Sequence, residues 1–586
     1  MNYKLNPEKT EPRAKGILSA ISVLTPLLLT ERKRLLFALT AIIANAGLTL
    51  VAPLLIGFTI DRHVTAGNYA GVLLFSGILL FVYVGALITS YLQTSLMGKV
   101  GQHVLFSVRN SIFEKLQSLP IAFFNQNKSG DLISRINNDT EKLNQFLSQS
   151  LVQFASGFFV ILGSGIFLIS IDPRLGAVAI APAVLVLLFS RIISPWMRAR
   201  NTKSLGSLGA LSSEIQEGIE NFKVIVAFNR RDYFRQRFAE VNEKNYKDAV
   251  KAGVANMVFQ PVYGLASNLA QLGTLTVGVY FISRGSFTIG LLISFVAYST
   301  TLYNQLRQIA AVWTNFQVAM SGWDRISDIL SLQNNLATIE VPAQNHSGGV
   351  LSFDAVGFQY SDGTRVLRSV SFSLEAGKTY ALVGPTGGGK TTTASLMARL
   401  FDPSEGTVFL HGKDIRGYSP EERTSKIGFI LQEPFLFAGT VKENIVYGMD
   451  EYVQLDTDAV HELLREAGLD SLLVRFEKGL DTPISLAGDA ISLGQKQLIA
   501  FMRAVLRKPD LLILDEATAN VDTVTEELLQ KILDALPKQT TRVVIAHRLH
   551  TIANADQIFF VNGGEIKNAG SMEHALSMLM HGKKSS

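Results

Sequence analysis

The sequence predicts a chain in two parts, an α-helical part that crosses a membrane and an α/β part that follows it. First, 586 residues exceed what a single hydrophobic core usually supports, so two or more domains are expected. Second, apolar runs crowd the first half of the chain, whereas the second half has the mixed composition of a soluble domain. Third, a mean hydropathy of +0.24 with 18% charged residues is too apolar for a wholly soluble protein.

Membrane-spanning helices need about 20 mostly apolar residues each. Six windows of this kind occur, at residues 36–60, 71–92, 151–171, 175–196, 262–282 and 287–312. The last window is the weakest, because STTLYNQLRQ places polar residues in it. A large helical bundle in water is the alternative, and six runs of this length argue against it.

Lysine and arginine set the orientation of these spans. The N-terminal ERKR and the long connections 98–148 and 197–256 are rich in both, whereas the short loops IDRHVTAGN, IDPRLG and SRGSF hold one Arg each. Because positive loops stay on the cytosolic side, the N-terminus, the long connections and the C-terminal domain are expected in the cytosol. We therefore expect an integral, multi-pass protein of the bacterial inner membrane.

Composition excludes several other classes. The net charge of +5 comes from scattered basic residues, so no nucleic-acid partner is expected. The chain has no cysteine, which excludes disulfides, thiol catalysis and cysteine-based metal sites. The first residues, MNYKLNPEKTEPRAKG, lack the apolar core of a cleavable signal.

The two long connections have helical periodicity, so we interpret them as spans that continue into the cytosol. Each has one interruption, LPIAFFNQNKSGDLISRINNDT in the first and EGIENFKVIVAFNRRDYF in the second. The interruptions are either turns of solvated hairpins or short helices that dock on the second domain, and the pattern favours neither. Pro, Asn, Ser and Gly mark residues 336–349 as a linker, between a membrane domain at 1–335 and a second domain at 350–586.

A phosphate-binding loop is the sharpest motif. An apolar strand at 379–383 precedes a glycine-rich loop and a helix, and the loop reads Gly384, Pro385, Thr386, Gly387, Gly388, Gly389, Lys390, Thr391. Backbone N–H groups and a helix N-terminus would hold phosphate oxygens there, with Lys390 at the β- and γ-phosphates. The Thr391 hydroxyl would contact Mg²⁺, and the site extends to Thr392.

Two further strands end in residues suited to hydrolysis. The predicted strand in DLLILDEAT ends in Asp515 and Glu516. Asp515 can hold Mg²⁺ through water, and Glu516 can act as general base toward the attacking water. Two adjacent acidic residues elsewhere would as often be a solvated turn. RVVIAHRL ends in His547, which we place at the γ-phosphate, although a lone His is more often structural.

These motifs resemble ABC transporters of the exporter type, in which a half-transporter joins one six-helix membrane domain to one nucleotide-binding domain. The resemblance covers residues 30–575 and includes GPTGGGKT, ILQEPFLFAGTVKENI, ISLGQKQLIAFMRAVL, LLILDEATANVDT and IAHRL in the family's order. It implies a six-helix membrane domain with long cytosolic extensions, followed by an α/β P-loop ATPase domain with a helical subdomain. It also implies that two chains pair, with each ATP between the phosphate loop of one chain and the signature of the other.

Further site residues follow from the same resemblance. Tyr360 matches the aromatic that stacks on adenine, although an isolated Tyr on a strand is usually core packing. Gln432 matches the glutamine that reaches Mg²⁺ and senses the γ-phosphate, and Asp522 matches the aspartate that communicates across the dimer.

The signature departs from the family's Leu-Ser-Gly-Gly-Gln. It keeps Ser492, Gly494 and Gln495 as ligands of the partner's ATP but places Leu493 at the first glycine. If that position needs a positive φ or a close phosphate, leucine costs about 1–2 kcal/mol in backbone strain before any clash. The SLAGD segment upstream departs as well, which puts a contact with the cytosolic helices in doubt.

An impaired signature beside an intact base is typical of one half of a heterodimeric exporter. The second half-transporter is therefore expected to be a different chain, with a homodimer that tolerates Leu493 as the alternative. The other function class is an ATP-gated channel or regulatory subunit that binds nucleotide without turnover, and the presence of Glu516 and His547 favours the transporter.

The substrate is only weakly indicated. No ionisable residue lies near the centre of a span, and Arg191 sits near a cytosolic end where it can snorkel. Five phenylalanines would suit an apolar cavity, although such residues more often face lipid or neighbouring helices: Phe158, Phe159, Phe167, Phe281 and Phe295. Membrane lipid surrounds the spans, and the cargo is a small molecule, lipid or peptide, with lipophilic or amphipathic cargo such as drugs or lipids favoured.

Overall fold

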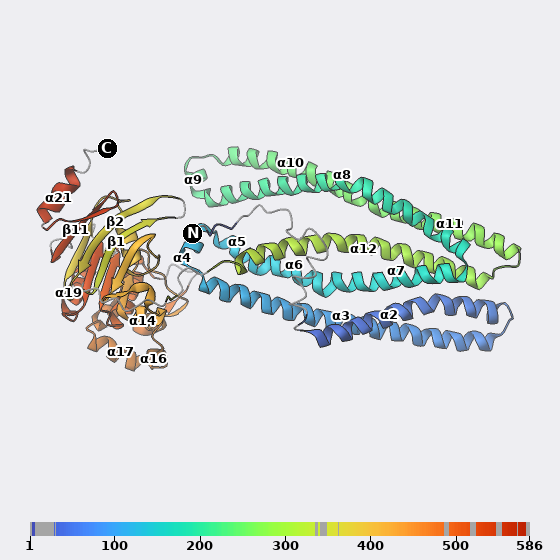
Figure 1. Ribbon diagram of the computed structural model, residues 1–586, viewed down its shortest axis with the longest axis horizontal. Coiled ribbons are helices and arrows are strands. Elements are labelled where there is room, and N and C mark those ends of the chain that lie inside the picture. Colours follow the sequence, from blue (N-terminus) through green and yellow to red (C-terminus); the bar gives the residue numbers. More distant parts are fainter. Residues whose placement is uncertain are drawn as a thin grey trace. The chain divides into compact units, whose positions relative to one another are not determined.

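The structure is a computed structural model that describes residues 3–5, 29, 31–333, 338–339, 349–360, 363–485, 491–515, 523–545, 554–570 and 572–581. It divides into two compact units (Figure 1). The helical unit comprises Asn6–Leu116 and Gly130–Ser331. The sheet-containing unit comprises Met1–Leu5, Gln117–Ser129 and Leu332–Ser586.

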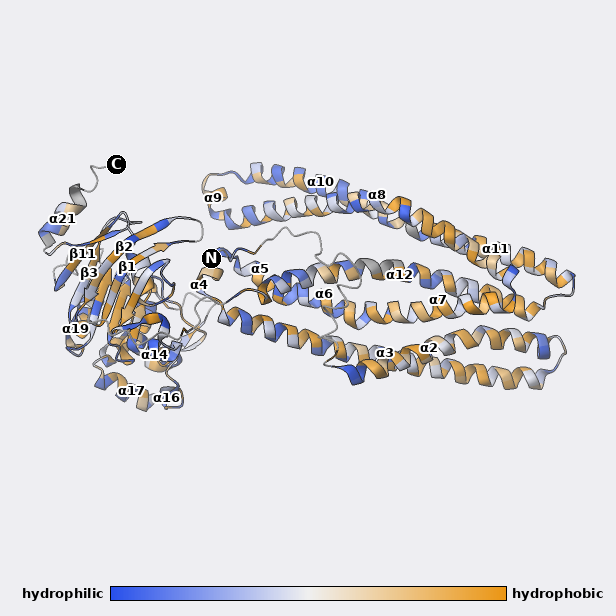
Figure 2. Ribbon diagram, viewed as in Figure 1, coloured by the Kyte–Doolittle hydropathy of each residue, from blue (hydrophilic) through white to orange (hydrophobic). Residues whose placement is uncertain are grey.

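Long helices that run alongside one another build the helical unit. Its elements are α2 Arg32–Thr59, η1 Ile60–Val64, α3 Tyr69–Ser118, α5 Ser129–Ser134, η2 Arg135–Asp139, α6 Thr140–Gln145, η3 Phe146–Ser150, α7 Leu151–Ile171, α8 Pro173–Glu220, α9 Phe222–Ala227, α10 Arg231–Met257, α11 Phe259–Ser283 and α12 Ile289–Leu330. Hydrophobic residues cover α2, α7 and α11, whereas hydrophilic residues gather on α10 (Figure 2).

Five helical stretches among the described residues are long and apolar enough to cross a membrane. They are Arg32–Val64, Tyr69–Ser118, Ser129–Ile171, Pro173–Glu220 and Arg231–Ser283. The sixth predicted window falls in α12, which is one continuous helix of 42 residues packed on α2, α7 and α11. The polar residues of this window make α12 too polar to be counted among the five stretches. This agrees with the sequence, in which the sixth window is the weakest.

The long connections are helical extensions of the spans, as predicted. α3 and α8 run on to Ser118 and Glu220. The first interruption holds the short helix α4 (Ile121–Gln126), followed by α5 and η2, and the second holds α9. The residues of α4 belong to the sheet-containing unit by their contacts. For this first interruption, the grouping favours the docking alternative.

Local capping explains where α8 begins. The Asp172 carboxylate accepts hydrogen bonds from the backbone N–H groups of Arg174 (2.9 Å) and Leu175 (3.0 Å), and Pro173 occupies the first helical position. An Asp cap followed by Pro satisfies the free donors of the first turn and presets its backbone angle. This pair turns the chain sharply between α7 and α8.

Polar contacts hold α12 to α2 near a proline. Pro53 lies inside α2, where its ring disturbs the carbonyls of the preceding turn. Three hydrogen bonds join the first turns of α12 to this region. The Ser294 hydroxyl donates to the Pro53 carbonyl (2.7 Å), and the Tyr298 hydroxyl donates to the Leu50 carbonyl (2.5 Å). The Gly290 N–H donates to the Asp61 carboxylate (2.7 Å). The first turns of α12 are thus anchored to α2 and η1.

A buried charge cluster anchors the other end of α12. The Arg135 side chain is fully buried and pairs through Nε with Asp131 (2.9 Å), while its NH1 donates to the Arg325 carbonyl (2.7 Å). Arg325 pairs with Asp131 (2.8 Å) and with the fully buried Asp139 (3.2 Å), which also pairs with Lys142 (2.9 Å). The cluster joins α5, η2 and α6 to α12.

Four of the five phenylalanines considered for a substrate cavity pack inside the bundle. Phe295 is fully buried, and Phe159, Phe167 and Phe281 pack partly buried against the same cluster. Phe158 is 52% exposed on the single chain. The four packed side chains therefore contact neighbouring helices, which is the more common place for such residues. They do not support an apolar substrate cavity.

Three sheets form the framework of the second unit. Their strands are β1 Leu351–Gln359, β2 Arg365–Leu374, β3 Thr379–Val383, β4 Glu405–Leu410, β5 Lys413–Asp414, β6 Ile427–Ile430, β7 Gly439–Thr440, β8 Pro483–Ile484, β9 Leu511–Asp515, β10 Thr541–Ile545, β11 Gln557–Asn562 and β12 Glu565–Asn568. The orders are β12-β11-β3-β10-β9-β6, β2-β1-β4-β5 and β7-β8.

Helices complete this unit. Besides α4 they are α13 Lys390–Met397, η4 Ile415–Gly417, α14 Pro420–Lys426, α15 Val441–Ile445, α16 Asp450–Val453, α17 Thr457–Glu466, η5 Asp470–Arg475, η6 Gly479–Asp481, α18 Leu493–Leu506, α19 Thr523–Ala535 and α21 Met572–His581. Buried residues of α15, α17, η5 and α18 share one apolar core. This core corresponds to the predicted helical subdomain.

Candidate functional site

Four parallel strands of the six-stranded sheet end at one edge. β3, β10, β9 and β6 are neighbours in that order, and the register aligns Leu382 with Ile545 and Ile545 with Asp515. The loop after β3 is the phosphate-loop motif, Asp515 is the last residue of β9, and Gln432 follows β6 by two residues. Ligands of α/β sheets bind at the carboxyl ends of such strands, so this edge is the candidate site.

The glycine-rich loop has the backbone that phosphate binding needs. Gly389 has φ +109 and precedes α13, and Gly384 has φ +152. A Cβ on Gly384 would lie 2.0 Å from the Val561 carbonyl oxygen, so only glycine fits. Lys390 is buried, and its Nζ donates to the carbonyls of Gly384 (2.9 Å) and Pro385 (3.0 Å). The loop, the N-terminus of α13 and this ammonium group together fit the triphosphate of ATP.

A side chain at Gly384 is expected to damage this loop more than one at Gly387. Gly384→Ala should weaken ATP binding at least about tenfold, because the loop must shift to relieve the clash with Val561. Gly387 has φ +81 but open space around it, so Gly387→Ala should cost only backbone strain of about 1 kcal/mol. Titration with a fluorescent ATP analogue measures both, and equal losses would contradict the steric argument.

Tyr360 stands beside the loop in an aromatic group. Its ring contacts Phe358 (centroids 4.9 Å apart) and Phe401 (5.8 Å), both edge to face. Its hydroxyl lies 3.0 Å from the Thr392 hydroxyl, in the first turn of α13. The structure therefore brings Tyr360 and Thr392 together, as residues of one predicted site.

Asp515 is buried at the end of β9, 2% exposed, whereas Gln432 and Thr391 are exposed. A carboxylate, a hydroxyl and an amide oxygen are a donor set that fits Mg²⁺. The predicted base Glu516, together with Asp522, His547 and Gly488 of the SLAGD segment, lies outside the described residues.

The signature residues begin α18. The Ser492 hydroxyl accepts the Gln495 backbone N–H (3.2 Å), and the Gln495 side chain accepts the Ser492 N–H (2.9 Å), which makes a capping box. The Gln495 amide also donates to the Arg475 carbonyl (2.6 Å). Gly494 follows in the first turn, so the predicted serine, glycine and glutamine share one helix terminus.

The backbone strain considered at Leu493 does not occur. Leu493 is the first residue of α18 and is not among the described non-glycine residues with positive φ. Helical backbone suits leucine at least as well as glycine, so this part of the expectation is wrong. The side chain is 44% exposed at the start of the helix. Any effect of Leu493 must therefore come from the space that its side chain occupies.

Arg503 is a site residue that sequence reasoning missed. It lies on α18 and donates to the carbonyls of Asn444 (2.7 Å) and Phe435 (3.3 Å). Phe435 is three residues beyond Gln432. Burial lowers the pKa of Arg503 from the ordinary value of an arginine, and the group stays charged at neutral pH. The signal was an arginine inside the apolar run QLIAFMRAVL. Arg503 thus ties the signature helix to the segment after Gln432.

A phosphate loop, a buried carboxylate and a capped helix on one α/β unit define a P-loop nucleotide-binding domain, joined here to helices long enough to cross a membrane. The sequence matches the profile of the ABC transporter transmembrane region over residues 35–306 and the profile described as ABC transporter over residues 367–519. These two matches fall on the helical unit and the sheet-containing unit.

Curated relatives match over most of their length. An uncharacterised ABC transporter ATP-binding protein of Bacillus subtilis, YfiC, is 32% identical over 94% of this chain and 91% of its own. A fatty acid ABC transporter ATP-binding/permease protein of Mycobacterium bovis is 32% identical, with 85% and 78% covered. A multidrug resistance ABC transporter protein of Lactococcus lactis subsp. lactis is 31% identical, with 83% and 82% covered.

The chain belongs to the ABC transporters and is a half-transporter of the exporter type. It is an integral, multi-pass membrane protein that couples ATP hydrolysis to transport. The sheet-containing unit is its ATP-binding domain, and half-transporters of this family generally act as dimers.

Proposed function

We propose that this half-transporter pairs with a different half-transporter to form an exporter whose two ATP sites are unequal. The observation that carries the proposal is Leu493, an exposed isobutyl group in the first turn of the signature helix. In a dimer, the phosphate loop of this chain faces the partner's signature, and Leu493 faces the partner's phosphate loop. The site made by this chain's phosphate loop and the partner's signature is the competent one. The site made by the partner's phosphate loop and this chain's signature is weakened, because leucine is bulkier than the glycine expected there.

At the competent site the residues of this chain have distinct roles. The loop from Gly384 to Thr391 holds the phosphates through backbone N–H groups, with the Lys390 ammonium at the β- and γ-phosphates. Tyr360 stacks on adenine, with its hydroxyl near Thr392. Glu516 accepts a proton from the attacking water, whose oxygen bonds to the γ-phosphorus as the bond to the β-phosphate breaks. His547 and Gln432 contact the γ-phosphate, and Asp522 links the two sites.

Mg²⁺ would be held by Thr391, Gln432 and Asp515. When bound, it offsets the charge of the β- and γ-phosphates. The position of Asp515 supports this role, because it is the last residue of β9 and lies at the same carboxyl edge of the sheet as the strand that leads into the phosphate loop.

The cargo is proposed to be lipophilic or amphipathic, exported across the inner membrane of a bacterium by alternating access. Relatives named for fatty acids and for multidrug resistance support that class. The spans have no ionisable residue near their centre, which agrees with an uncharged or amphipathic cargo.

Purification of the chain alone, in detergent or nanodiscs, tests the pairing. Its mass and its Mg²⁺-dependent ATPase rate are measured, with Glu516→Gln as the blank. The proposal expects a monomer or a silent dimer that gains activity when a neighbouring half-transporter is coexpressed. A homodimer with a Glu516-dependent rate would overturn the heterodimer and leave the homodimer that tolerates Leu493.

Restoring glycine at the signature gives a second prediction. Leu493→Gly should raise the ATPase rate of the assembled transporter at least about threefold. Removal of the side chain should relieve a steric cost of about 1 kcal/mol at the phosphate. Leu493→Ala is the matched variant, since it keeps a Cβ and should recover less. Rates unchanged in both variants would mean that the leucine does not impair the site.

A further inference from the structure

Residues 3–5 lie against α4, more than a hundred positions away in sequence. The Tyr3 and Leu5 side chains are buried, 5% and 7% exposed, while Lys4 between them is exposed. Alternate burial of successive side chains is the pattern of an extended strand with one covered face. The segment therefore sits on the ATP-binding domain as a short extended peptide with two apolar anchors.

One amide side chain pairs with the backbone of this peptide. Asn127 accepts the Leu5 N–H through Oδ1 (2.9 Å) and donates through Nδ2 to the Tyr3 carbonyl (3.0 Å). These two groups lie on the same side of an extended chain, so a single amide satisfies both. The Tyr3 N–H also donates to the Gln126 side chain (2.8 Å). Such pairing recognises an extended backbone at a fixed register.

The same amide also holds α4. Asn127 Nδ2 donates to the Phe123 carbonyl (2.7 Å), and the Phe123 side chain is fully buried. The carbonyl groups at the end of a six-residue helix have few partners of their own. Asn127 therefore joins the end of α4 and the peptide into one hydrogen-bonded group.

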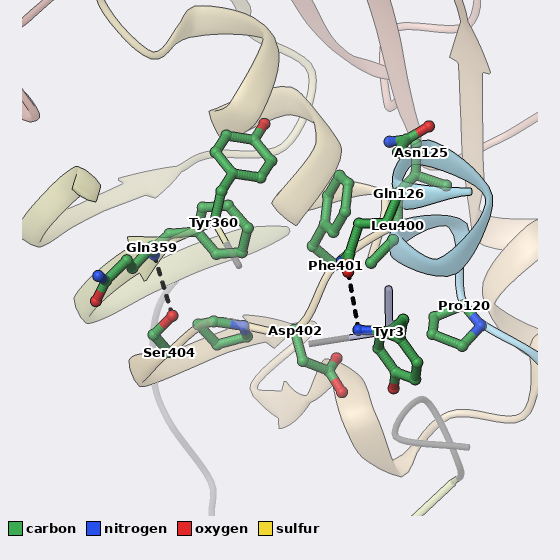
Figure 3. A pocket seen from close by; sticks show the side chains of 13 residues that line it. Tyr3, Pro120, Asn125, Gln126, Gln359, Tyr360, Leu400, Phe401, Asp402 and Ser404 are labelled. Atoms are coloured by element: carbon green, nitrogen blue, oxygen red, sulfur yellow. Dashed lines mark hydrogen bonds between the residues drawn. The ribbon is translucent and has the colours of Figure 1, made fainter. Parts of the chain in front are cut away.

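This group borders a cavity of about 290 Å³ beside Tyr360. Tyr3 and Gln126 line one side of the cavity and Tyr360 the other, with Phe401 between them (Figure 3). Asp402, which also lines it, is paired with the buried Arg399 at 2.9 Å. The wall opposite the aromatic group is thus made by α4 and by residue 3, which lies outside every motif of the ATP site.

We propose that Tyr3–Leu5 form a latch that holds α4 on the ATP-binding domain and completes the wall of the cavity that lies across from Tyr360. Tyr3 is a positioning residue, since it shares the cavity with Tyr360 and is not itself one of the predicted phosphate ligands. The effect on ATP rests on the proposed role of Tyr360 at adenine, whereas the hold on α4 does not. Release of the latch breaks its three hydrogen bonds with Gln126 and Asn127. It also exposes the buried side chains of Tyr3 and Leu5.

The test uses the full transporter with residues 1–5 deleted behind a new initiator Met, and the point variant Asn127→Ala. Hydrogen–deuterium exchange over residues 121–127 should accelerate at least about tenfold in both variants, because the end of α4 loses its partners. The Kd of a fluorescent ATP analogue should rise about three- to tenfold, with kcat within about twofold of the parent. Asn127→Ala keeps the test independent of whether the truncated chain folds.

Asn125→Ala is the matched control. Asn125 lines the same cavity from α4, but its side chain makes no hydrogen bond within the described part of the chain. Exchange and Kd should stay at the parental values. If Asn125→Ala and Asn127→Ala behaved alike, the specific pairing would be refuted.

Rescue in trans adds a readout that a general structural defect would not give. An acetylated MNYKL peptide should restore slow exchange and the parental Kd in the truncated transporter, and a peptide with alanine at positions 3 and 5 should not. Unchanged exchange on truncation would overturn the latch. Faster exchange with an unchanged Kd would overturn the positioning role. Tyr360→Ala separates the two proposals, because an unchanged Kd there rejects the adenine assignment while exchange at α4 still reports on the latch.

Discussion

Replacing Glu516 by glutamine is expected to reduce ATP turnover at least about 100-fold while ATP binding stays intact, the range that general bases contribute. Glutamine keeps the shape of glutamate but cannot accept the proton of the attacking water. In the sequence, Glu516 directly follows Asp515, the last residue of β9. The loop, Lys390 and Tyr360 are untouched by the change, and they carry the binding energy.

Turnover is measured as phosphate release at saturating Mg²⁺-ATP in the assembled transporter, and binding by titration with a fluorescent analogue. Glu527→Gln is the matched control, because it makes the same chemical change at an exposed position on α19 and should leave the rate within about twofold. Retained turnover in Glu516→Gln would refute the assignment of the base. A loss of binding would mean that the residue holds the nucleotide.

Replacing Arg135 by methionine is expected to lower the free energy of unfolding of the helical unit by about 3–5 kcal/mol, as removal of one partner from a buried ion pair does. Methionine keeps the length and removes the charge. Asp131 would lose one of its two arginine partners, and the carbonyl of Arg325 would lose a donor in a buried place. The Arg135 side chain is fully buried, so its loss is felt inside the cluster, although Asp131, at 31% exposed, can still be partly hydrated.

Thermal unfolding in detergent, followed by the signal of a dye that reports exposed apolar surface, measures this loss. Lys142→Met is the matched control, because it removes another cation of the same cluster whose side chain is 40% exposed and whose pairing should contribute less than about 1 kcal/mol. Equal shifts of the unfolding temperature in the two variants would contradict the argument from burial. A silent Arg135→Met would show that the cluster contributes nothing to stability.

Local patterns predicted most of the architecture and much of the site. The spans, the phosphate loop and Asp515 follow from apolar runs and fixed spacings, which depend only on neighbouring residues. The charge cluster could not be found that way, because Arg135 and Arg325 are 190 positions apart and no local pattern pairs them. The contact of Tyr3 with Gln126 spans 123 positions, and the polar N-terminal sequence gave no sign of it.

Leu493 shows what sequence cannot supply even within a motif. Its place in the signature was clear from spacing, but its effect depended on the backbone angle at that position. The capping box of Ser492 and Gln495 begins the helix at Leu493, so the angle is the ordinary helical one. A consensus glycine therefore indicates either a need for positive φ or a need for space, and only coordinates distinguish them.

The length and continuity of α12 give it a mechanical property. At a rise of 1.5 Å per residue, the 35 steps from Gly290 to Arg325 make a rod of about 53 Å. α2 and α8 contain interior prolines where they can bend, and α12 has none. A rigid rod of this length amplifies rotation, because a tilt of about 5° at the Asp61 contact would carry Arg325 through about 5 Å. A small rotation at one end of α12 would therefore strain the ion pairs of Arg325 at the other end.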